Sequence, residues 1–478
     1  MAVAYTALFL WIFVTLALYA MCRPPLATAL AFVLGTMFLP SATSFDPPIF
    51  PAIGKQEVIS IMALLASYIF AGRRMRRAKL GRGLEVLILV SMIGVVFSVF
   101  SNTDSLRAGP MVVPGTGPTD FLANAIEQAL RWGVPFFLGR AMFTRTSDAK
   151  ILFIVLAVAG FVYTFPMMVE LQISPQLHRF LYGFHQHAFV QTKRGDGYRP
   201  MVFMAHGLHL SLFMVMCMAS AATLWRLRQK ILKFRVGPLA VYLGVMLIAC
   251  KSTGSTVYGM FIAPMVALAP SNIQVRAATA IALVVFSYPV LRTYNLLPYD
   301  YVINLAVEYS SQRRANSLQA RLDTEQAMME RIKQRPWFGW ASAGRSANRD
   351  DVTGEMSTVY DGYWVIVLGK RGIVGYVTLF AMLLLPIYGA YRAMPRIKSR
   401  NDRLVLGSLC LMIVINVFDL IPNSTTEGYL TLLSGAVAGL VPGMQRKQAA
   451  RSREKARGRH MGDGKSRLAG VLTSHRPH

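Results

Sequence analysis

The sequence predicts an all-α, polytopic integral membrane protein. Of its 478 residues, 54% are hydrophobic and only 15% are charged, whereas an ordinary soluble domain carries about 25% charged residues. Apolar runs of ~18 residues recur along the chain, and each is long enough to cross ~30 Å of hydrocarbon as a helix. These runs are continuous rather than alternating, which favours helices over a transmembrane β-barrel.

The short connectors between the apolar runs are rich in arginine and lysine, and the formal net charge is +27. Because basic residues mark the cytoplasmic side of membrane proteins, we interpret this charge as a topology signal and not as nucleic-acid binding. The first apolar run lacks a basic n-region and a cleavage site, so we expect a span and not a signal peptide. The basic connectors are 72–83, 139–150, 225–235 and 391–403, followed by the basic segment from Arg446 onward.

Placing every basic connector in the cytoplasm gives about thirteen transmembrane helices, with the N-terminus outside and the C-terminus inside. The membrane domain is then 1–444, and the polar, basic segment 445–478 is expected to be a disordered tail that is attracted to anionic lipid. The expected helices are 3–21, 26–40, 57–71, 84–100, 120–139, 149–168, 200–224, 236–250, 252–270, 276–293, 372–391, 403–421 and 428–443.

Two long segments, 169–199 and 294–371, fall on the outer face. Connectors of this length in a compact protein are usually functional or disordered. The first is rich in aromatic residues and histidine, and for His185 and His187 we favour sugar stacking or loop packing over a metal site. The second contains an amphipathic helix, 316–336, with an apolar stripe at helical spacing formed by Leu318, Leu322, Met329 and Ile332.

Several kinds of chemistry have no motif in this sequence. The chain has no Walker loop, no dinucleotide fingerprint, no HExxH and no CxxC, and its four cysteines are scattered. We therefore expect no metal, no cofactor, no disulfide framework and no ATP-driven transport.

Charged residues inside the expected spans are few. Glu127 and Arg131 lie four residues apart, which favours an intrahelical ion pair, although ionisable groups inside a membrane are also functional candidates. Asp419 lies near an outer helix end, where it can reach the interface.

Basic side chains on the outer face form the strongest candidate site. Arg199 and His206 are seven residues apart at the start of an expected helix, and Arg314 and Arg321 have the same spacing in the second outer segment. Guanidinium groups bind phosphate through two parallel hydrogen bonds, so converging side chains of this kind suit a diphosphate. The alternative is surface solvation with local pairing, for example between Arg321 and Glu325.

Two stretches, "SLQARLDTEQAMMERIKQRPWFGWASAGRS" and "YDGYWVIVLGKRGIVGY", resemble the signature of the bacterial O-antigen ligase and O-antigen polymerase superfamily. That signature has an arginine on a helix, a P-x-x-G-x-G turn, a His-Asn or Asp-Asn pair, a short amphipathic helix and a G-I-x-G start of the next span. In this chain Arg321 matches the helix arginine and Asp361 the His/Asp position. The glycine and proline positions of the signature are matched by Pro336, Gly339, Gly372 and Gly375.

Upstream, "YRPMVFMAHG" and "KSTG" resemble motifs of the exopolysaccharide polymerase branch, with Arg199, His206 and Lys251 in matching places. From its position alone, Lys251 would be a residue of a tight turn that reaches the interface. The chain departs from the signature at Ala341, where the turn has a second glycine, and at Gly362, where the pair has asparagine. The ligase histidine is absent, which argues against a ligase.

The resemblance implies transfer of a glycan from a polyprenyl diphosphate carrier, such as undecaprenyl diphosphate, to an acceptor hydroxyl. The expected protein is a repeat-unit polymerase for exopolysaccharide or O-antigen. It would act on the periplasmic face of the bacterial inner membrane, with membrane lipids, a chain-length regulator and export machinery as partners. The alternatives are a glycan ligase with a lipid or protein acceptor and a transporter of lipid-linked oligosaccharide, which should show internal repeats.

The resemblance makes Asp361 the candidate group that contacts the acceptor hydroxyl, either as a base or as an orienting acceptor. The alternative is that Asp361 caps the helix that begins near Tyr363, since aspartate is a favoured N-cap.

Overall fold

The structure is a computed structural model that describes residues 1–48, 50–195, 197–294, 296, 308, 312–356 and 361–473, without side-chain detail for 312–315, 317, 318 and 451–473. The described α-helices are α1 (Ala2–Met21), α2 (Pro24–Phe38), α3 (Lys55–Ala78), α4 (Val86–Phe100), α5 (Pro118–Gln128), α6 (Val134–Met142), α7 (Thr146–Ile173), α8 (Leu177–Tyr182), α9 (Gly207–Arg226), α10 (Gly237–Ala249), α11 (Thr253–Ala267), α12 (Ser271–Thr293), α14 (Gln312–Lys333), α15 (Ala343–Ser346), α16 (Tyr363–Ala393), α17 (Arg400–Asp419) and α18 (Gly428–Thr473).

Strands are few and short in the described ranges. They form four two-stranded antiparallel hairpins in the connectors: β1 (Ser44–Phe45) with β2 (Ile53–Gly54), β3 (Leu106–Ala108) with β4 (Met111–Val113), β5 (Lys193–Arg194) with β6 (Gly197–Tyr198), and β7 (Lys230–Ile231) with β8 (Phe234–Arg235). Three short helical turns lie between the α-helices: the π-helical η1 (Ala129–Gly133) and the 3₁₀-helical η2 (Phe189–Thr192) and η3 (Met394–Arg396).

Each of the thirteen ranges expected from hydropathy contains helix, so the all-α class is confirmed. Seven helices of the described chain are long and apolar enough to cross a membrane: α1, α3, α7, α9, α12, α16 and α17. That thirteen helices cross the membrane stays a prediction. Some boundaries are wrong: the helix expected from residue 200 begins only at Gly207, and the helix expected to end at residue 71 continues to Ala78.

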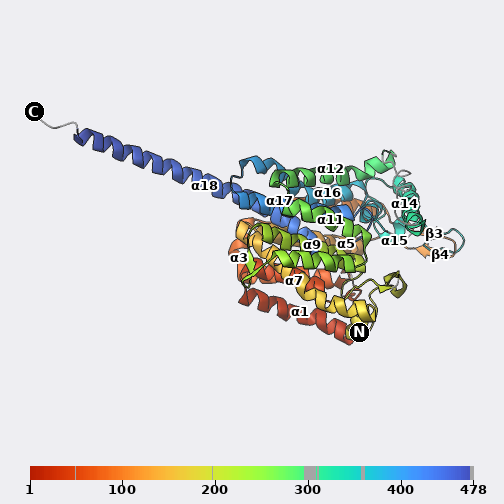
Figure 1. Cartoon of the computed structure of the whole chain (residues 1–478). Coiled ribbons are helices and arrows are strands. Elements are labelled where there is room, and N and C mark those ends of the chain that lie inside the picture. The colour runs from red at the N-terminus through yellow and green to blue at the C-terminus, as the bar shows by residue number, and fades with distance from the viewer. Residues whose placement is uncertain are drawn as a thin grey trace, which may run out of the picture.

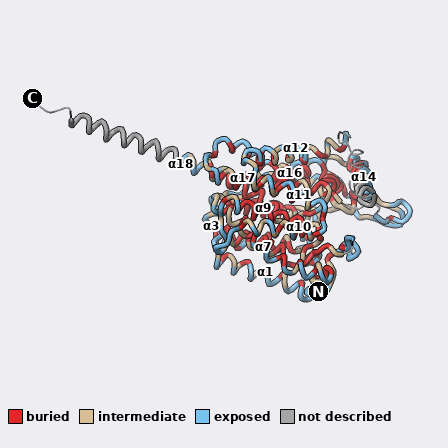
Figure 2. Tube along the Cα trace, viewed as in Figure 1, coloured by how far each residue is buried: buried red, intermediate tan, exposed pale blue. Residues whose placement is uncertain are grey.

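The outer helices carry large apolar side chains on their surface. Phe13 of α1 is 56% exposed, Ile93 of α4 57% and Val241 of α10 71%. A soluble monomer rarely shows so much apolar surface, whereas hydrocarbon solvates such a surface well. This exposed apolar surface and the seven long apolar helices indicate that the protein is embedded in a membrane. Figure 2 shows buried residues concentrated in the interior of the bundle.

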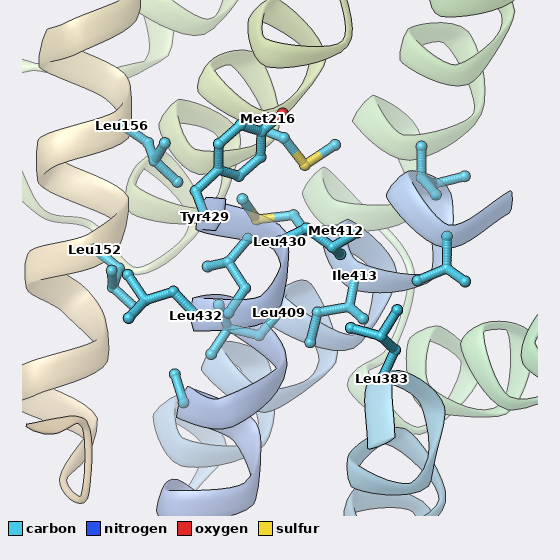
Figure 3. Packing of buried hydrophobic residues seen from close by; sticks show 14 of the residues in the cluster. Leu152, Leu156, Met216, Leu383, Leu409, Met412, Ile413, Tyr429, Leu430 and Leu432 are labelled. Carbon is cyan, nitrogen blue, oxygen red and sulfur yellow. The ribbon is translucent and has the colours of Figure 1, made fainter. Parts of the chain in front are cut away.

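Helix α17 lies at the centre of the packing and is almost wholly buried along its length. Figure 3 shows side chains of α7, α9, α16, α17 and α18 meeting in one cluster that includes Leu152, Met216, Leu383, Leu409 and Leu430. In this bundle the loop that joins α17 to α18 is therefore held between several helices.

Small residues let α18 pack closely on α6. Gly435, Gly439 and Gly443 recur every four residues, and a Cβ added at any of them would lie within 3.0 Å of a backbone carbonyl of the segment 136–144. Such small-xxx-small patterns allow close backbone approach between membrane helices.

The basic connectors 72–83 and 139–150 lie at the end of the bundle opposite to the described parts of the two long segments. Helix α7 connects them, because Arg145 precedes it at one end while Glu170, in its last turn, binds the chain at residues 201 and 202. Figure 1 shows α14, α15, β3 and β4 together at one end. We call this the α14 end and the other the arginine-rich end.

The expected disorder of the segment 445–478 stays a prediction. The backbone of α18 continues as a helix to Thr473. The segment is rich in Ala, Arg and Lys, which have high intrinsic helix propensity.

Candidate functional site

The loop between α17 and α18, residues 420–427, collects polar side chains from distant parts of the chain, and we call it the hub loop. Arg321 of α14 donates from Nη1 to the Pro422 carbonyl at 3.0 Å and to Asn423 Oδ1 at 3.4 Å. Asn423 in turn donates to Asp419 Oδ1 at 2.8 Å, and Thr425 donates to the other carboxylate oxygen. Asp419 is 3% exposed, so it lies in the interior and not at the interface as expected.

Arg321 also pairs with Asp361. Their Nε and Oδ2 atoms are 3.5 Å apart, and the side chains are 35% and 38% exposed. The pair is accessible from the α14 end, and only part of each side chain is used by protein contacts.

Two alternatives for these residues are wrong. Asp361 does not cap α16, because Gly362 is the N-cap residue and no side chain caps the helix. The first amide group of the helix is instead satisfied by the hub loop, since Tyr363 N–H donates to the carbonyls of Leu420 and Asn423.

Glu325 does not pair with Arg321 either. Its carboxylate lies 3.4 Å from Arg292 Nε and accepts a hydrogen bond from Trp364 Nε1 at 3.3 Å. Met329 and Ile332 of the expected apolar stripe are buried. These contacts dock α14 on α12 and α16, which fixes the position of Arg321.

Arg199 follows the β5–β6 hairpin and is only 7% exposed. Its Nη2 donates to the Lys251 carbonyl at 3.2 Å, and it forms no ion pair with a described residue. Burial lowers the pKa of Arg199 to about 10, and the charges of Arg194 and Arg321 act in the same direction. Arg199 therefore stays protonated at neutral pH, and an anion placed beside Arg199 and Arg321 would relieve their mutual repulsion.

His206 does not lie inside a helix as expected. It is the N-cap of α9, and its Nδ1 accepts a hydrogen bond from Leu208 N–H at 3.1 Å. The preceding residues stay non-helical because the Glu170 carboxylate binds the amide groups of Met201 and Val202 at 2.8 and 2.7 Å. Arg199 and His206 thus do not share a helix face.

His206 also differs from the expectation in charge. Burial, followed by the neighbouring His187 and Arg199, lowers the pKa of His206 to about 3. The imidazole is therefore neutral at neutral pH. Since Nδ1 accepts a hydrogen bond, the proton lies on Nε2, and His206 can donate a hydrogen bond but adds no positive charge.

Lys251 and Arg314 complete the expected set. Lys251 occupies the turn between α10 and α11 with φ 51°, and its ammonium group lies against Gly197 in the β5–β6 hairpin. The Lys251 carbonyl therefore accepts a hydrogen bond from Arg199, and the Lys251 ammonium group adds a second positive charge next to the β5–β6 hairpin. The backbone of Arg314 belongs to α14, and its side chain lies outside the described residues.

A histidine–carboxylate pair at the same loop was not predicted from the sequence. His209 Nδ1 lies 2.8 Å from Glu427 Oε1, and the side chains are 15% and 4% exposed. A histidine oriented through one ring nitrogen by a carboxylate can accept a proton at the other nitrogen. The available signals were weak: a second histidine three residues after His206 and an acidic residue immediately before an apolar run.

The turn 336–340 and Gly372 form a joint within α16. Gly372 has φ 62° and ψ −165°, which interrupts the helix. The turn 336–340 occupies the break: Trp340 N–H donates to the Gly369 carbonyl and Ile373 N–H to the Pro336 carbonyl, both at 2.8 Å. Gly339, with φ 70°, packs against the same break, and Gly375 packs against the Arg371 side chain.

A charged cluster holds the short helical segment that precedes this joint. Lys370 Nζ lies 2.9 Å from Glu127, Arg371 Nη2 lies 3.8 Å from the same carboxylate, and Arg131 Nη1 lies 3.4 Å from it. The expected pair of Glu127 with Arg131 is present, and Arg131 also pairs with Glu57 of α3. The cluster therefore fixes the segment that carries Asp361 onto α5 and α3.

No protein-family model and no curated protein matches this chain. Within the described ranges, no group of three His, Cys, Asp or Glu side chains could hold a metal ion. The site is therefore described by its own chemistry: Arg321, an accessible carboxylate and an oriented histidine lie around one loop, and the buried Arg199 is close enough for the charge of Arg321 to act on it.

Proposed function

We propose that this protein joins polyprenyl-diphosphate-linked oligosaccharide units, as a membrane polysaccharide polymerase of the exopolysaccharide or O-antigen type. The observation that carries the proposal is the partly exposed Arg321–Asp361 pair on the hub loop, with the buried cation Arg199 in the same region. Such a site offers a carboxylate for a hydroxyl group and cations for a diphosphate. The resemblance of the surrounding motifs to the ligase and polymerase superfamily supports the same chemistry.

In the proposed reaction the acceptor hydroxyl oxygen forms a bond to the anomeric carbon of the donor sugar. The bond from that carbon to the diphosphate oxygen breaks, and its electron pair leaves with the diphosphate. Arg199 and Arg321 stabilise the charge that develops on the leaving group. The hydroxyl proton passes to a base, for which Asp361 and His209 are the two candidates.

Two alternatives remain beside this proposal. A glycan ligase would use the same donor with another acceptor, and Asp361 in place of the ligase histidine favours the polymerase. A transporter of lipid-linked oligosaccharide would need charged groups along a path through the bundle. The gathering of Arg199, Arg321 and Lys251 at the α14 end favours a reaction at the surface.

The identity of the base is tested with isosteric substitutions. Asparagine at Asp361 keeps the shape and hydrogen bonding but cannot take a proton. If Asp361 is the base, cells with Asp361→Asn accumulate single lipid-linked units, whereas His209→Gln still makes polymer. Lipid extracts and polymer length on gels measure this. If His209 is the base, the outcomes are exchanged, and Glu427→Gln lowers the rate through misorientation of His209. Normal polymer from all three variants would refute acid–base chemistry at this site.

The orientation in the membrane is tested by cysteine labelling. In a Cys22→Ser background, we expect Val352→Cys, in an exposed turn at the α14 end, to react with a membrane-impermeant maleimide in cells whose outer membrane is permeabilised. Arg77→Cys, at the arginine-rich end, should react only after the inner membrane is opened. The reverse labelling pattern would place the site on the cytoplasmic side and exclude the proposed periplasmic reaction.

A further inference from the structure

The arginine-rich end contains a cavity of about 1160 Å³ that the proposed reaction does not use. It lies between α3, α6, α7, α16 and α18, on the side of the bundle away from the hub loop. Seven of its lining side chains are basic, and none of the described lining residues is acidic. A cavity of this size and charge is suited to an anionic ligand.

Three of these basic groups already have a partner nearby. Arg74 lies 3.6 Å from Asp148 and Lys447 lies 3.9 Å from Asp402, while Arg140 pairs with Glu85. These ion pairs fix the wall of the cavity. The positive charge of the cavity is only partly neutralised by these three ion pairs, because four further arginines line the cavity.

Those four arginines are Arg77, Arg82, Arg145 and Arg446, and all are exposed. None of them forms an ion pair within 4.0 Å in the part of the chain that the structure describes. They come from three different segments, namely α3 with its following connector, the α6–α7 connector, and α18. The fold thus brings separate basic segments around one cavity instead of spreading them over the surface.

The other wall of the cavity is apolar and continues onto the lipid-facing surface. Leu385 and Tyr388 of α16 line the cavity and are 41% and 48% exposed. Both belong to a helix of membrane-spanning length. A ligand with a phosphate group in the cavity and a hydrocarbon chain along α16 would satisfy both walls.

We propose that this cavity binds the headgroup of an anionic phospholipid, with its phosphate among Arg77, Arg82, Arg145 and Arg446 and its acyl chains against Leu385 and Tyr388. Basic pockets between membrane helices bind such headgroups by charge attraction. The site would seat a lipid between α3, α16 and α18 and so link the membrane composition to the packing of these helices.

The test uses the full-length protein in zwitterionic detergent micelles and titrates a fluorescent phosphatidylglycerol, with fluorescent phosphatidylcholine as the neutral comparison. We expect saturable binding of phosphatidylglycerol alone. The triple variant Arg77→Gln, Arg82→Gln, Arg145→Gln should bind on the order of 100-fold more weakly, since each cation near a charged lipid surface contributes about a fivefold factor. Arg82→Gln alone should bind about fivefold more weakly, which keeps the test valid if the triple variant does not fold.

The matched control is a triple variant that removes three exposed arginines from the same end but outside the cavity: Arg228→Gln, Arg235→Gln, Arg276→Gln. It has the same net charge and should bind like the wild type. Equal loss in both triple variants would overturn the proposal, because binding would then follow total charge. Displacement of the lipid by equimolar inorganic phosphate or pyrophosphate would also overturn it and assign the cavity to a soluble phosphate compound.

Discussion

Replacing Arg321 by alanine is expected to reduce polymer formation by on the order of 100- to 1,000-fold, while the protein still inserts in the membrane. This is the range seen when one donor to a developing negative charge is removed. Arg321→Lys should restore activity only in part, because an ammonium group lacks the planar fork of a guanidinium. Polymer yield and the accumulation of lipid-linked units, both normalised to membrane-bound protein, measure the effect.

The control for this substitution is Lys333→Ala. Lys333 lies on the same helix, its side chain is 58% exposed, and its nearest acidic group is Glu330 at 3.9 Å. Its loss removes one positive charge from α14 without touching the hub loop, so polymer formation should stay normal. Full activity of Arg321→Ala, or equal loss in both variants, would remove the diphosphate role of Arg321 from the proposal.

The second large effect is expected at the joint in α16. Gly372→Ala should destabilise the protein by about 3 kcal/mol, because φ 62° with ψ −165° is a region that only glycine occupies readily. An added Cβ would also lie within 3.0 Å of the Trp337 carbonyl and of the Phe338 amide. The midpoint of thermal unfolding in detergent and the steady-state amount in membranes both report the loss.

Gly389→Ala is the matched comparison for the joint. Gly389 lies in the same helix, and a Cβ there would meet nothing within 4 Å. Alanine is favoured over glycine inside a helix by about 1 kcal/mol, so this variant should be at least as stable as the wild type. A Gly372→Ala protein with unchanged unfolding temperature would show that the break in α16 is not required.

The joint also connects the fold with the candidate site. It ends the short segment 363–371, whose first residues bind the hub loop and whose last residues bind Glu127. Asp361, directly before this segment, is therefore positioned from both sides. A substitution at the joint should lower activity even in protein that remains folded, because it shifts Asp361 relative to Arg321.

The sequence by itself determined the helical class, the presence of helix within each of the thirteen expected ranges and the concentration of arginine in the short connectors. Each of these depends on local properties, namely the length of an apolar run and the composition of a connector, which do not require knowledge of distant neighbours. The start of α9 was missed by seven residues for the opposite reason. The carboxylate of Glu170, about thirty residues earlier in the chain, accepts hydrogen bonds from the amide groups of Met201 and Val202. These residues therefore do not join the helix.

Only the tertiary structure decided which charged groups meet. Arg321 had a plausible partner one turn away in Glu325, yet it pairs with Asp361 and the hub loop, because Arg292 and Trp364 engage Glu325 when α14 docks. His206 is neutral because it is buried, and the His209–Glu427 pair joins residues more than 200 positions apart. The partner of a charged side chain and its burial both depend on how whole helices pack. The local sequence does not specify which distant residues will pack against it.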